Sequence, residues 1–143
     1  MILSAQQLFS DKQAITATAL STNVIDLGVR GTPYGAAAPV NGDIGKGNSV
    51  PLLVQVTEDF NTLTSLTVTV ETGATTALGT ALISQTVLLA DLTAGWQFNE
   101  VDLPKGVTGR YVGIRYTVTG TAPTTGRMTA GISMGNQTNT TGA

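Results

Sequence analysis

The feature that most constrains this chain is an alternation of apolar and polar residues with a period of two. It recurs at residues 65–71, 111–119 and 127–134. Such alternation is typical of antiparallel β-strands that bury one face and expose the other. The polar residues between the apolar ones, such as Thr67 and Glu71, should therefore face solvent. The apolar positions, which we expect to face the core, are Leu66, Val68, Val70, Val112, Ile114, Tyr116, Val118, Met128, Ala130, Ile132 and Met134.

Further strands are predicted where β-branched threonine and valine gather between turn-forming residues. These segments are 14–19, 23–28, 50–57, 81–89 and 95–101, which brings the total to about eight strands. No segment has a helical period of 3.6, although residues 88–92 could form one helical turn. The sequence therefore predicts an all-β fold, a two-sheet antiparallel β-sandwich with jelly-roll topology as the leading arrangement.

The chain has 143 residues, a length that suits one domain. We expect a single jelly-roll domain over residues 13–134 and a flexible, polar C-terminal tail over residues 135–143. Residues 1–12 precede the first clear strand signal and carry four large apolar side chains, so they are predicted to form an N-terminal arm. The arm either packs on a neighbouring subunit or shell, or covers its own sandwich.

Composition excludes several functional classes. The chain has no cysteine and no histidine, which removes disulfides, Ser-His-Asp and Cys-His nucleophile systems and ordinary zinc sites. Charged residues are 11% of the chain and its seven cations are scattered, so we expect no nucleic-acid binding. There is no apolar run of membrane-spanning length and no signal-peptide pattern at residues 1–9, so we expect a protein made in the cytoplasm without membrane attachment.

Two carboxylate pairs are candidates for catalysis. Glu58 and Asp59 are adjacent, so in a strand their side chains point to opposite faces and cannot cooperate. Glu100 and Asp102 share a face at about 6.5–7 Å, a spacing compatible with an inverting glycosidase, although a solvated strand edge is the better explanation. We therefore predict no catalytic residues and no enzyme activity.

Residues 41–48 form a glycine-rich stretch that superficially resembles a cation or phosphate loop. They lack the acidic spacing of an EF-hand, and Lys46 is followed by Gly47 where a P-loop has serine or threonine. A turn is the better interpretation, and we expect no metal site and no cofactor. Trp96 alternates with Phe98, which indicates a packing pair within the sandwich more than a ligand platform.

The connection Val29–Ser49 is unusually long for a compact domain, and such loops are commonly functional. It contains Arg30, which could meet an acidic partner, and Tyr34, which could serve as a rigid anchor. A loop without any partner is the simpler alternative.

Several segments together resemble the small jelly-roll capsid cement proteins of tailed bacteriophages, also called decoration proteins. The similar segments are residues 8–19, residues 21–28 (Ser-Thr-Asn-Val-Ile-Asp-Leu-Gly), Gly95-Trp96, Leu103-Pro104 and residues 110–116. The resemblance implies a structural virion protein on the outer capsid surface that binds the major capsid protein shell and cements neighbouring capsomers. It also implies a homo-oligomer, with a dimer favoured and a trimer possible.

From this resemblance and the apolar, aromatic or cationic character of the residues, the predicted capsid or subunit contacts are Leu3, Leu8, Phe9, Arg30 and Tyr34. One alternative is a carbohydrate- or receptor-binding β-sandwich on the virion that uses Trp96, Tyr34 or Tyr111 as a stacking surface. Another is a glycan hydrolase that uses Glu100 and Asp102.

Overall fold

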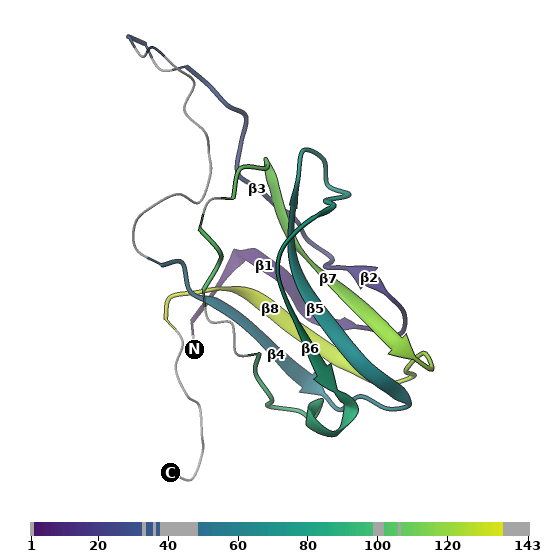
Figure 1. The fold of residues 1–143 in the computed structure, drawn as a ribbon. Helices are drawn as coiled ribbons and strands as arrows, with labels where there is room; N and C mark the ends of the chain where they lie inside the picture. Colours follow the sequence, from purple (N-terminus) through teal and green to yellow (C-terminus); the bar gives the residue numbers. More distant parts are fainter. Residues whose placement is uncertain are drawn as a thin grey trace.

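Two antiparallel β-sheets pack against each other in the computed structural model (Figure 1). The structure describes residues 2–32, 34–35, 37, 49–98, 102–105 and 107–135. The three-stranded sheet has the order β1-β8-β4, formed by Leu3–Ala14, Arg127–Ser133 and Leu52–Glu58. The five-stranded sheet has the order β2-β7-β5-β6, with β3 also paired to β7; its strands are β2 (Ala19–Leu20), β3 (Ile25–Asp26), β5 (Leu63–Gly73), β6 (Thr80–Leu88) and β7 (Tyr111–Gly120). The predicted all-β sandwich of eight strands is confirmed.

The core lies between the two sheets and uses the alternate positions that the sequence pattern predicts. Leu66, Val68, Val70, Val112, Ile114, Tyr116, Met128 and Ala130 are all buried. Val118 and Ile132 are half-buried and pack against the margin of the core. Met134 is the exception, because it follows the end of β8 and is 80% exposed.

The predicted solvent face of β5 is largely covered. Ser65, Thr69 and Glu71 are buried although they point away from the core. β5 is an interior strand between β6 and β7, so side chains on both neighbours shield it. The β5–β6 connection adds further cover, because Arg115 on β7 binds both the Glu71 carboxylate at 2.7 Å and the Ala77 carbonyl at 3.3 Å. The alternation is therefore correct, whereas the expected exposure of these three residues is not.

The beginning of the chain differs from the prediction. The predicted strand over residues 14–19 is wrong: β1 ends at Ala14, and residues 16–18 form a bend. Residues 3–12 lie within β1 and pair with β8, so in this structure the segment covers its own sandwich. A large bulge explains the missed strand, since residues 4–7 lie opposite Ile132 alone and interrupt the period of two. Beyond Gly135, the predicted tail lies outside the described residues.

The segment around Trp96 lies along the outer edge of β4. Gln97 forms a single antiparallel bridge with Gln55, and the Phe98 N–H donates to the Val54 carbonyl at 2.9 Å. The described part of the predicted 95–101 strand is thus one bridge, not a regular strand. Trp96 and Phe98 stack edge to face with centroids 4.6 Å apart, and Phe98 is buried, so the predicted packing pair is confirmed.

Residues 88–92 contain the only helical turn of the described chain, the 3-10 helix η1 (Leu89–Asp91), where the sequence allowed one. Among the described residues there is no helix with the length and apolar character that crossing a membrane requires.

Candidate functional site

The long connection leaves the sandwich from a rigid polar base. β3 ends at Asp26, whose carboxylate accepts the Gly28 N–H at 2.8 Å, and Gly28 adopts a φ of 91°, where glycine is favoured. The Arg110 side chain binds both oxygens of the same carboxylate, at 2.8 and 2.7 Å. Two-point contact of this kind fixes the orientation of both groups. The chain is therefore held in one conformation just before it departs.

Electrostatics at this base follow from that contact. The hydrogen bonds from Arg110 and from the Gly28 N–H lower the pKa of Asp26 to about 2. The hydrogen bond to Asp26 raises the pKa of Arg110 above its usual value. The Arg110 guanidinium also lies 5.0 Å from the centroid of the Tyr111 ring, a cation–π distance. Both charges are thus maintained over the whole physiological pH range.

Beyond this base, the described residues of the connection are strongly exposed. Val29 is 74% exposed and Tyr34 is fully exposed, while Arg30 reaches back to the Thr108 carbonyl at 3.3 Å. Figure 1 shows the described part of this segment extending away from both sheets. An aliphatic group, a cation and a complete aromatic ring are therefore exposed together on this segment. The stretch 41–48, considered above for a cation or phosphate, lies outside the described residues.

The other three predicted contact residues are placed differently. Phe9 is completely buried in the core of its own chain, so it is no exposed contact in this structure. Leu3 and Leu8 are half-buried on β1. Leu8 lies across β8 at Gly131, where a Cβ atom would come within 2.8 Å of the Leu8 side chain. The structure thus groups Arg30 and Tyr34 on one exposed segment and places the β1 residues in the sandwich.

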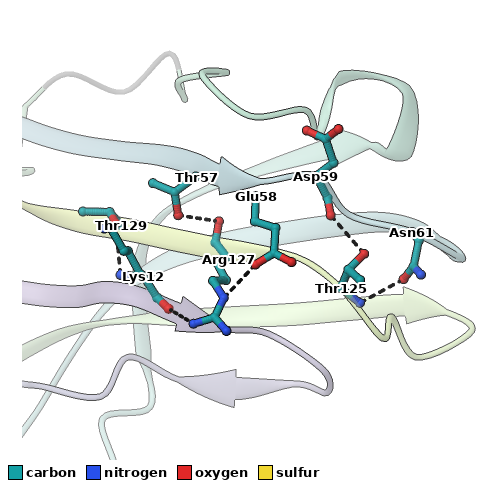
Figure 2. A network of polar contacts seen from close by, with 8 residues as sticks. All are labelled: Lys12, Thr57, Glu58, Asp59, Asn61, Thr125, Arg127 and Thr129. Carbon is teal, nitrogen blue, oxygen red and sulfur yellow. Dashed lines mark hydrogen bonds and ion pairs between the residues drawn. The ribbon is translucent and has the colours of Figure 1, made fainter.

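A second polar region joins the ends of β1 and β4 to the start of β8 (Figure 2). Arg127 donates to Glu58 at 2.7 Å and to the Lys12 carbonyl at 3.3 Å. Asp59 points away from this pair in Figure 2, and its carboxylate accepts the Ala94 N–H at 2.6 Å. The two adjacent carboxylates therefore have separate partners, as their spacing predicted.

This region borders a shallow polar hollow of about 50 Å³, lined by Ala14, Thr16, Glu58, Thr124, Thr125, Gly126 and Arg127. Its one carboxylate is already paired with Arg127, and Asn61 fixes the adjoining turn by accepting the N–H groups of Thr124 and Thr125. Its residues hold strands together. No group of three or more acidic, histidine or cysteine side chains that could hold a metal ion occurs within the described parts of the chain.

Among the residues proposed for sugar chemistry, those that the structure describes do not gather into one site. Glu100 lies outside the described residues, and Asp102 is half-buried in a bridge with Pro51. Trp96 is half-buried against Phe98, and the Arg110 guanidinium lies over the ring of Tyr111. Only Tyr34 of the three candidate aromatic side chains offers its whole ring to solvent among the described residues.

Reasoning from the sequence missed Asp26 and Arg110, which position the exposed segment. A signal for half of the pair exists, because Asp-x-Gly is a common turn sequence in which the aspartate accepts the glycine N–H. The partner of Asp26 had no such signal, since Arg110 is remote in the chain.

Comparison with known proteins gives one match of wide coverage. The family model Bbp16 matches residues 9–132, which span β1 from its buried Phe9 to nearly the end of β8. A search of curated proteins gave no match. Because the match covers most of the chain, the protein belongs to the Bbp16 family.

Proposed function

We propose that this protein is a structural component of a bacteriophage virion that binds the outer surface of the capsid and cements neighbouring capsomers. Its partner is the shell of the major capsid protein, it acts as a homo-oligomer, and it has no catalytic role. Membership of the Bbp16 family and the sequence resemblance to capsid cement proteins support this proposal.

The strand order supports a jelly-roll topology as part of the proposal. Gln97 and Asp102 bridge to residues 55 and 51, so they extend the three-stranded sheet beyond β4. On the same side of the sandwich, β6 is the edge strand of the five-stranded sheet. Apart from β2 and β3, which both pair with β7, and β5 and β6, which pair with each other, successive strands then alternate between the two sheets, as in two interlocked Greek keys. A rigid sandwich of this kind can carry a load between capsomers without a cofactor.

The observation that carries the proposal is the exposed segment with Arg30 and Tyr34. An exposed tyrosine gives a large contact area at a small cost in side-chain entropy, and the fixed Asp26–Arg110 base limits the backbone entropy lost on binding. Arg30 can pair with carboxylates of the shell. These are the properties of a protein contact surface.

The test compares the wild type with R30E/Y34A on phage heads that lack the protein. Occupancy is measured by sedimentation and gel densitometry, and the double variant should need on the order of 10- to 100-fold more protein for half occupancy. Lys12→Glu is the matched control, because it reverses an exposed charge at the end of β1, beside Arg127. Circular dichroism should show both variants folded.

Two results would contradict the proposal at different levels. Normal occupancy by the double variant would exclude the Arg30–Tyr34 segment as the contact. Heads that resist heat or low ionic strength equally well with and without bound wild-type protein would exclude the cementing role itself. A glycan array and a glycan hydrolysis assay should both be negative.

A further inference from the structure

The edges of the two sheets are not equally protected. The outer edge of β4 is covered by the segment that contains Trp96 and Phe98. β1 carries the bulge at residues 4–7, and its Phe9 carbonyl accepts the Asn23 N–H at 2.9 Å. β2 and β3 have two residues each. Coverage, bulges and shortness all hinder strand addition.

β6 forms the remaining edge and has less protection. It runs for nine residues, Thr80–Leu88, without a charge or a proline, and no described strand pairs with its outer side. Its one bulge, at Leu82, lies near its beginning, so residues 83–88 pair regularly with β5. Leu88 is 60% exposed. A long neutral edge of this kind favours pairing with another strand.

A small apolar hollow of about 10 Å³, the size of one water molecule, opens beside this edge. Ile83 and Gln85 of β6 line it together with Val54 of β4 and Phe98, and almost all of its wall is apolar. A strand added to β6 would direct every second side chain toward this hollow, because side chains alternate along a strand. The most suitable strand would therefore place apolar residues at those positions.

β6 itself has that pattern. Read outward from Gln85, Ser84 corresponds to Thr86, Ile83 to Val87, and Leu82 to Leu88. Two antiparallel copies centred on Gln85 would therefore pair hydroxyl with hydroxyl and apolar with apolar. The register with β5 places Ile83 and Val87 opposite the core residues Val70 and Leu66, and Ser84 and Thr86 opposite Thr69 and Thr67. Ile83 and Val87 thus share the face of the hollow.

We propose that β6 is the subunit interface: it pairs antiparallel with β6 of a second copy about a two-fold axis at Gln85. Such an interface is isologous, so each favourable pair occurs twice. Gln85 already makes an interaction within its own chain, and the proposed pairing relies on the residues on either side of it. This inference specifies the homo-oligomer of the proposed function as a dimer.

The register makes the interface testable by charge. In the proposed pairing, Ser84 of one copy lies opposite Thr86 of the other, and both are exposed in the single chain. S84K/T86K would place lysine opposite lysine, whereas S84K/T86E would place lysine opposite glutamate. Both variants lose the Thr67–Thr86 hydroxyl contact of 2.8 Å, so they are matched for that loss.

Analytical ultracentrifugation over a concentration series measures the dissociation constant. We expect a wild-type dimer, a dissociation constant raised on the order of 100-fold for S84K/T86K, and a dimer for S84K/T86E. An equal mixture of S84K/T86K with S84E/T86E should form heterodimers. Circular dichroism and thermal melting should show that each variant is folded.

Three results would overturn the inference. The first is a wild-type protein that stays monomeric up to about 1 mM. The second is equal association by S84K/T86K and S84K/T86E. The third is a monomeric wild type whose head binding is abolished by S84K/T86K, which would assign β6 to a strand of the shell. A monomeric S84K/T86K that still binds heads would support the β6 dimer and leave the capsid contact elsewhere, so the two proposals can fail independently.

Discussion

Tyr116→Phe should destabilise the protein at neutral pH and do so less as the pH rises. Tyr116 is completely buried, and its hydroxyl lies 2.9 Å from Oγ of Ser10. Ser10 also donates to Gln13 at 2.7 Å, so it keeps one partner after the substitution. The loss of one buried hydrogen bond without a fully orphaned partner should cost about 1–1.5 kcal/mol at pH 7.

The pH dependence follows from the ionisation of the tyrosine. Burial raises the pKa of Tyr116 above its usual value of 10, and the hydrogen bond with Ser10 only partly offsets this. Below pH 10 the Tyr116 hydroxyl stays protonated in both the folded and the unfolded state, so its hydrogen bond contributes its full share to the free energy of unfolding. Above pH 10 the unfolded chain ionises and the native state does not, which favours unfolding by about 1.4 kcal/mol at pH 11. The stabilities of wild type and variant should therefore meet near pH 11.

Urea denaturation followed by circular dichroism at pH 7, 9, 10 and 11 gives both free energies of unfolding. Only the difference between the two proteins matters, because effects of pH on other groups are common to both. Tyr34→Phe is the control, since it removes a hydroxyl from a fully exposed ring and should change stability by less than about 0.5 kcal/mol. A difference between Tyr116→Phe and wild type that stays constant from pH 7 to 11 would refute the reasoning.

Three further predictions concern other parts of the sandwich. Gly126→Ala should lower the free energy of unfolding, measured by thermal denaturation, by at least about 2 kcal/mol, because Gly126 has a φ of 129° and a Cβ there would overlap the Phe60 ring. Gly28→Ala is the control and should lower it by less, because the space around Gly28 is open. Arg115→Met should lower the free energy of urea unfolding by about 2 kcal/mol, because it leaves the buried Glu71 carboxylate without its countercharge, and adding Glu71→Leu should recover part of that loss. An NMR titration of the Asp26 carboxyl should give a pKa of about 2 in the wild type and a value nearer 3.8 in Arg110→Gln. Because the pKa is lowered in the folded protein, any stability from this pair is present at neutral pH and is lost as the pH falls through about 2. An unchanged Asp26 titration in Arg110→Gln would contradict the assignment.

The regular strands could be predicted from the sequence because each one alternates apolar residues that face the core with polar residues that point away from it. β5 and β7 retain strict alternation, so Val68 and Ile114 were placed correctly. β1 could not be recognised, since its bulge at residues 4–7 breaks the period of two and a second register shift, between Leu8 and Ser10, accompanies the burial of both Phe9 and Ser10. Local patterns describe a strand only while its register stays regular.

For the candidate site, exposure at Tyr34 followed from its place in a long polar connection. Its fixed base did not, because the Asp26–Arg110 pair depends on the pairing of β3 with β7. The same limit applies to Glu71: its sequence position indicates a solvent-facing carboxylate, and only tertiary structure brings Arg115 and the β5–β6 connection over it.

The position of β8 has a consequence for how the chain folds. β8 is the last described strand, and it lies between β1 and β4, both of which come much earlier in the sequence. As the chain leaves the ribosome, neither β1 nor β4 has its sheet partner until residues 127–133 emerge. Closing such distant contacts is slow, so folding on the scale of milliseconds to seconds is expected. A polypeptide stalled before residue 127 would lack the strand that joins β1 to β4, so the three-stranded sheet could not close over the core.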